Sequence, residues 1–164
     1  MGMVWVMTVA SDQEVAQLRD NPSAIYDFVN SQDAYESGRT LDLDKQWHAV
    51  HFLLTGSAEI TNDPLSLIIG RFEEIGPDNG YGPAWFVPKD FITNFNNAIS
   101  SLSYDELVAR YDTDAMVHEN VYIADALASE GEEGRGFVLE DVARLRAFVA
   151  TAAADGSSAF ALIT

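Results

Sequence analysis

Residues 41–56, LDLDKQWHAVHFLLTG, hold the densest group of side chains in the chain that could do chemistry. Asp44 and His48 are four residues apart, and His48 and His51 are three apart, so on a helix all three share one face. Two imidazoles and a carboxylate suit zinc or non-haem iron. A further ligand must come from elsewhere, and the familiar helical motif H-E-x-x-H spaces its histidines differently. The three residues are therefore a weak candidate for a metal site.

The same segment also fits a core helix whose polar residues are structural. An apolar stripe recurs along it at helical spacing, at Leu43, Trp47, Val50 and Leu54. Asp42 or Asp44 can cap the start of this helix, and Gly56 can end it. His51 lies beside the stripe and then becomes a hydrogen-bonded core histidine. Three interpretations stay open, namely a metal site, part of an active site, and a capped core helix.

A second distinctive stretch is the turn-forming loop at residues 77–83, PDNGYGP. It matches neither G-x-x-x-x-G-K-[ST] nor G-x-G-x-x-G, so it is not a phosphate loop. Tyr81 in the loop and Trp85 just after it add two aromatic rings. We expect a packed surface loop or, alternatively, one wall of a small-ligand cleft near Trp47, His51, Tyr81 and Trp85.

The sequence offers no coherent catalytic set. It has no cysteine, which excludes disulfides, thiolate metal sites and cysteine nucleophiles. The nucleophile motif G-x-S-x-G is absent, and paired carboxylates are too frequent here to indicate a glycosidase. We therefore expect no cofactor, and a non-catalytic protein rather than an enzyme.

A formal net charge of −17 is the most unusual property of the composition, and each half of the chain carries 13 acidic residues. Such a chain repels phosphate backbones, so we expect binding neither to nucleic acid nor to anionic membranes. It suits solubility, or a basic protein partner attracted by electrostatic steering. No apolar run approaches the roughly 20 residues of a membrane span, and the start lacks the basic region of a signal peptide. We expect a cytoplasmic protein.

The predicted elements indicate an α+β fold. Strands are expected at residues 3–9 and 158–164, with extended segments at 71–76 and 84–88. Capping boxes at Ser11 and Ser103 begin two of the expected helices, which cover residues 11–20, 22–29, 43–56, 64–70, 89–102, 103–111 and 139–153. Polar loops are expected at 30–40 and 128–136. The prediction is one compact domain over residues 1–164, whose small sheet includes the N- and C-terminal strands and is covered by several helices.

Several motifs together resemble the YfbM-like family, a bacterial family of unknown function. They are MGM before a strand, LDLDKQWHAVHFLLTG, NDPLS-x-x-x-G, IG…GYGPA, VPKDF and LSYDELVARYD. The most specific pattern is L-D-[LI]-D-K-x-W-x-x-x-H-F-x-L-T-G, which this chain matches at Leu41, Asp42, Asp44, Lys45, Trp47, His51, Phe52, Leu54, Thr55 and Gly56. The resemblance covers essentially the whole chain and implies a compact α+β domain of the bacterial cytoplasm. It implies no reaction, cofactor or partner.

Three functional hypotheses follow, the last of them a metal protein built on the site described above. The first is a non-catalytic binding or regulatory module, for example an immunity-type protein, that meets a basic protein partner. The second is a small-ligand protein or enzyme with the cleft described above. The candidate functional or ligand-contacting residues are Asp42, Asp44, Lys45, Trp47, His51, Tyr81 and Trp85. The sequence leaves the oligomeric state open.

Overall fold

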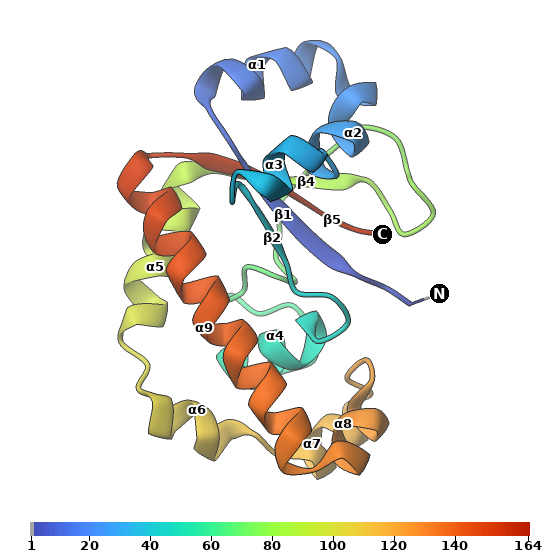
Figure 1. Cartoon of the computed structure of the whole chain (residues 1–164), viewed down its shortest axis with the longest axis vertical. Coiled ribbons are helices and arrows are strands. Elements are labelled where there is room, and N and C mark those ends of the chain that lie inside the picture. The colour runs from blue at the N-terminus through green and yellow to red at the C-terminus, as the bar shows by residue number, and fades with distance from the viewer. Residues whose placement is uncertain (1) are drawn as a thin grey trace.

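The structure, a computed structural model, describes residues 2–164 and contains a single five-stranded sheet (Figure 1). The strands are β1 (Trp5–Ala10), β2 (Thr40–Asp42), β3 (Glu73–Ile75), β4 (Ala84–Val87) and β5 (Ser158–Ile163). Their order is β2-β1-β5-β4-β3, and every neighbouring pair is antiparallel. The strands from the two ends of the chain pair over their full length at the centre, from Trp5↔Ile163 to Ala10↔Ser158. The predicted α+β fold is confirmed.

The helices begin where the sequence supplies caps. At Ser11 and Ser103 the hydroxyl oxygen accepts the N–H of the residue three positions on, and that residue's carboxylate accepts the N–H of the serine, so both predicted capping boxes are confirmed. The helical elements are α1 (Asp12–Asp20), the 3-10 turn η1 (Pro22–Ala24), α2 (Ile25–Val29), α3 (Gln32–Glu36), α4 (Trp47–Thr55), α5 (Lys89–Ser100), α6 (Tyr104–Arg110), α7 (Thr113–His118), α8 (Ala124–Glu130) and α9 (Glu132–Asp155).

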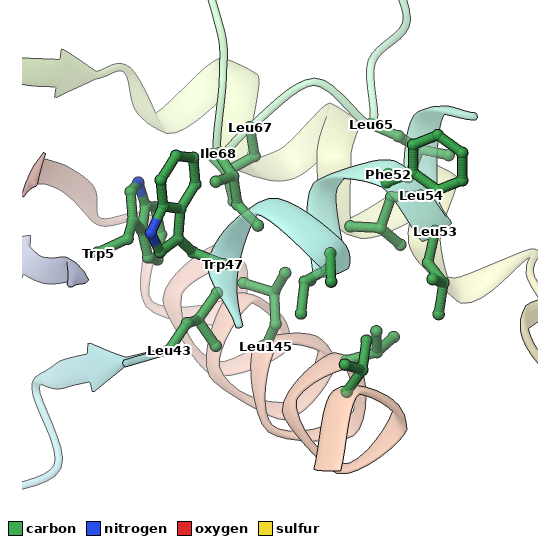
Figure 2. Packing of buried hydrophobic residues seen from close by; sticks show 14 of the residues in the cluster. Trp5, Leu43, Trp47, Phe52, Leu53, Leu54, Leu65, Leu67, Ile68 and Leu145 are labelled. Atoms are coloured by element: carbon green, nitrogen blue, oxygen red, sulfur yellow. The ribbon is translucent and has the colours of Figure 1, made fainter. Parts of the chain in front are cut away.

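The sheet is buried on both faces because its central strands alternate between two cores. Trp5 and Met7 face the larger core, which α4, α5 and α9 cover, and Val6 faces the smaller core beneath α1 and α2. Figure 2 shows Trp5 and Trp47 among the buried side chains of the larger core, together with Leu43 and Leu145. Both aromatic rings are therefore part of the packing that holds α4 to the sheet.

Helix α9 is the longest element, with 24 residues, and runs from α8 up to the sheet (Figure 1). At about 1.5 Å per residue it spans roughly 36 Å. The helix predicted at 139–153 is confirmed, but the polar loop predicted at 128–136 is wrong, because helix extends through it on both sides of Gly131. Gly131, with φ +59°, makes the break between α8 and α9. The polar residues there form exposed helix faces instead of a loop.

Two further predictions were wrong. The polar segment 30–40 is not a loop, because Ser31 caps α3 and Thr40 begins β2, an edge strand that exists by pairing with β1. The segment 64–70 is not a helix. Its apolar side chains are buried in the larger core, and side chain–backbone hydrogen bonds hold it, such as Leu65 N–H to Asp63 Oδ1.

Candidate functional site

The signature segment 41–56 is built as strand, turn and helix. The Asp42 carboxylate accepts the N–H of Asp44 at 2.7 Å, and Asp44 adopts φ +45°, so the chain turns sharply after β2. Helix α4 begins only at Trp47, with Gln46 at the N-cap position. The prediction that Asp42 or Asp44 caps this helix is therefore wrong, since both carboxylates stand outside it. The predicted end at Gly56 is confirmed by its left-handed backbone, φ +74°.

His48 has a hydrogen-bond partner at both ring nitrogens. Its Nδ1 accepts the backbone N–H of Tyr122 at 2.9 Å, and its Nε2 lies 2.8 Å from the carbonyl oxygen of Ala58. Because Nδ1 accepts, the ring proton sits on Nε2 and is donated to Ala58. The ring also stacks on Trp47, whose Nε1–H donates to the Met3 carbonyl. His48 therefore ties α4 to the loop that follows it and to the turn between α7 and α8.

His51 is fully buried and has a similar structural role. Its Nε2 lies 2.9 Å from the carbonyl oxygen of Glu59, the residue after the one that His48 holds. Burial lowers the pKa of His51 below its ordinary value, and the Glu59 carbonyl opposes that shift without reversing it. The ring is therefore neutral at pH 7. The two histidines together hold the loop that leaves α4, and we call them the histidine clamp.

The three weak candidates for metal ligands do not converge on one point in this structure. Asp44 is exposed in the turn before α4, whereas His48 and His51 are hydrogen-bonded to backbone groups. Within residues 2–164 no group of three or more His, Cys, Asp or Glu side chains is placed to hold a metal ion.

The remaining candidates from the sequence lie apart from one another. Trp47 is 5% exposed in the larger core, Trp85 is half-buried on β4, and Tyr81 is 47% exposed in the loop after β3. Lys45 is exposed, and its side chain lies close to Gly2. Five surface hollows stand out on the molecule, and none is lined by Trp47, His51, Tyr81 or Trp85.

The most prominent hollow lies between β2 and α9 and has a volume of about 550 Å³. Arg144 joins it to a second hollow of about 310 Å³, and Val9, Arg39 and Asp155 join it to a third of about 370 Å³. We call this series the β2–α9 groove. Its α9 wall is one helical stripe, formed by Phe137, Glu140, Asp141, Arg144, Ala147, Phe148, Thr151, Ala152 and Asp155. The facing wall comes from Val9, residues 37–41 and, at the ends, Ser11, Glu14, Asp44, Gln46 and Ser157.

Two arginines line the groove, and each is already engaged. Arg39 Nη2 donates to the Glu14 carboxylate at 2.7 Å and to the Val9 carbonyl. Arg144 pairs with Asp141 at 2.7 Å and donates to the carbonyl oxygen of Asp42 at 3.0 Å. Burial raises the pKa of Asp141 above its ordinary value despite this arginine. The groove is therefore preformed, and each of its two arginines is already paired with a carboxylate of the groove itself.

Sequence reasoning missed this groove because its walls are about a hundred residues apart. Its lining residues are also of ordinary types, such as Ala147, Thr151 and Ser37. The signal that was available is the α9 stripe itself, where polar residues such as Glu140, Arg144 and Thr151 recur at helical spacing beside the apolar face of the helix.

This chain is similar to known proteins over nearly its whole length. The family model "Domain of unknown function (DUF1877)" matches residues 1–161. The crystal structure of YfbM from Escherichia coli, described as a protein of unknown function, is similar with a TM-score of 0.72 and 18% identity, over 98% of this chain and 99% of that one. A search of curated proteins found no match. Among the described residues, no helix is long and apolar enough to cross a membrane. The family match extends over nearly the whole chain, in agreement with the YfbM-like resemblance, and the chain belongs to the DUF1877 family.

Proposed function

We propose that this protein is a non-catalytic binding module for a basic protein partner, acting in the bacterial cytoplasm in a regulatory or immunity-type role. The observation that carries the proposal is a large excess of carboxylates that the fold itself does not neutralise. The sequence has 26 acidic and 9 basic residues. A surface of this kind speeds association with a positively charged partner and repels negatively charged ones.

The basic residues support this proposal because most of them already bind groups of the same chain. Arg110 donates to the carbonyls of Leu53 and Leu54 at the end of α4, and Arg146 donates to those of Ile99 and Leu102 at the end of α5. Five others form ion pairs, namely Arg19–Glu73, Arg39–Glu14, Lys89–Asp12, Arg135–Glu132 and Arg144–Asp141. In the part of the chain that the structure describes, most carboxylates therefore form no ion pair.

The negative charge is densest in the tier made by α6, α7, α8 and the start of α9, at the end of the molecule away from α1 (Figure 1). Residues 104–133 carry nine carboxylates, and their one basic residue, Arg110, is turned toward the end of α4. Tyr104 and Phe137 are 65% and 45% exposed on the same tier. Aromatic residues are enriched at protein interfaces.

Capture of partners by the purified chain tests the proposal. We expect the captured proteins to be basic, with isoelectric points above about 9, and to be released when salt is raised to about 1 M, where screening acts within about 3 Å. Capture of proteins without this bias, or capture that is insensitive to salt, would contradict the proposal.

Matched charge variants sharpen the same experiment. The first neutralises three exposed carboxylates of the acidic tier, Asp114→Asn, Asp125→Asn and Glu133→Gln. The second neutralises three exposed carboxylates of α1–α3, Asp20→Asn, Asp27→Asn and Asp33→Asn. Both change the net charge by the same amount. We expect capture to weaken clearly more with the first variant, because the tier then loses a third of its carboxylates.

A further inference from the structure

We propose that the β2–α9 groove holds an extended, basic segment of the partner protein, which adds a strand to the open edge of the sheet at β2. The positive charge of this segment rests on the proposed function. The position and the extended conformation rest on the geometry of the groove alone.

Strand β2 ends the sheet on one side, and its outer backbone groups face away from β1. Leu43 N–H donates to the Trp5 carbonyl and Val9 N–H donates to the Arg39 carbonyl, so the odd-numbered residues 39–43 bond inward. By the alternation of an antiparallel ladder, the backbone groups of Thr40 and Asp42 point outward. The Asp42 carbonyl meets Arg144 of α9, which leaves the Thr40 groups as the edge that an added strand can pair with.

The dimensions of the groove fit an extended segment. Its α9 wall runs from residue 137 to 155, which at 1.5 Å per residue is about 27 Å. An extended chain of about eight residues covers that length. Leu41, Phe148 and Ala152 give the central hollow an apolar floor, and Thr40 and Thr151 lie at its sides. Side chains of a strand point alternately to two sides, so apolar residues can face the floor while the others face the charged rim.

The charge of the groove selects the chemistry of the segment. Five carboxylates line it, from Glu14, Asp44, Glu140, Asp141 and Asp155, against Arg39 and Arg144. Both arginines are paired with carboxylates of this set, so Asp44, Glu140 and Asp155 remain, all of them exposed. A segment with lysine or arginine at alternate positions meets three unpaired carboxylates, whereas an acidic segment is repelled.

Fluorescent peptides test the proposal on the full chain. The probe is an eight-residue peptide in which lysine and valine alternate, and its counterpart has glutamate in place of lysine. We expect saturable binding of the lysine peptide and none of the glutamate peptide. Thr151→Trp places an indole in the central hollow, and Ala154→Trp places one on the exposed surface of the same helix outside the groove. We expect the first variant to weaken binding at least tenfold and the second to leave it unchanged.

Backbone methylation separates strand addition from simple charge attraction. Methyl groups on the amides of either the lysines or the valines block one of the two edges of the peptide strand. We expect one of these two peptides to lose binding and the other to keep it, because a single edge faces β2. Equal binding of both, no binding of the unmodified lysine peptide, or equal effects of the two tryptophan variants overturns the proposal.

The partner-capture experiment separates the failure of this inference from the failure of the proposed function. Undiminished capture of basic proteins by Thr151→Trp overturns the groove as their site and leaves the proposed function standing. Failure of the unaltered chain to capture basic proteins overturns the proposed function, and with it the basic character of the segment.

Discussion

The histidine clamp and the β2–α9 groove both include residues of the signature segment 41–56, but they use these residues in opposite ways. The clamp is made of the residue types associated with chemistry, and it directs them inward to backbone carbonyls at 2.8 and 2.9 Å. The groove is lined by small residues, two phenylalanines, two paired arginines and three carboxylates that form no ion pair in the described part of the chain, and it is open. The comparison teaches that residue type alone is a poor guide to function in this chain. A polar side chain whose hydrogen-bond partner lies inside the fold indicates a structural role. Unpaired polar groups at the open edge of a sheet indicate a binding role.

The largest effect is expected at the tryptophan beside the clamp. Trp47→Ala removes a buried ring that stacks on His48 and packs near Trp5, and large-to-small core changes of this kind cost about 3–5 kcal/mol. The free energy of unfolding, measured with urea, should fall by that amount. Trp85→Ala is the matched control, since its ring is half-buried, and it should cost clearly less. Equal losses of stability in the two variants would mean that Trp47 is no more important to the fold than Trp85.

A smaller but still large effect is expected at the clamp itself. His48→Phe keeps a ring against Trp47 but leaves the Tyr122 N–H and the Ala58 carbonyl without their partner. Each unsatisfied buried group costs about 1–3 kcal/mol, and both of these hydrogen bonds are only partly buried, so we expect a loss in the lower part of the summed range, about 2–4 kcal/mol, in urea unfolding. Hydrogen exchange at Tyr122 should also become faster. An unchanged exchange rate there would contradict the role assigned to Nδ1.

Much of the fold was predictable because its signals are local. The capping boxes at Ser11 and Ser103 fix two helix starts within four residues, and β1 reads as a strand from its own apolar run. The errors arose where distant partners decide. Residues 40–42 form a strand because β1 lies beside them, and Asp42 shapes a turn where the sequence suggested a helix cap. The same reason hid the groove, because Thr40 and Thr151 line one hollow only in the folded chain.

The clamp should also make stability depend on pH. Burial lowers the pKa of His51 in the folded state, so below the unfolded value of about 6.5 the unfolded chain binds more protons. The free energy of unfolding therefore falls as the pH drops below about 6.5, by at most about 1.4 kcal/mol per pH unit for this one group. His51→Gln should flatten this slope between pH 6.5 and 5. An unchanged slope in this variant would count against the clamp.

The smallest effect on stability is expected in the groove, in contrast to the clamp. Thr151 and Ala154 are both exposed on α9, and away from buried contacts a substitution usually shifts the free energy of unfolding by no more than about 0.5 kcal/mol. Thr151→Trp and Ala154→Trp should therefore both unfold close to the unaltered chain in urea, although only the first fills the groove. A loss above about 1 kcal/mol for Thr151→Trp alone would show that the groove wall is part of the core. A region that accepts such changes without loss of stability is free to be shaped by what it binds, whereas the clamp is constrained by the fold that it holds together.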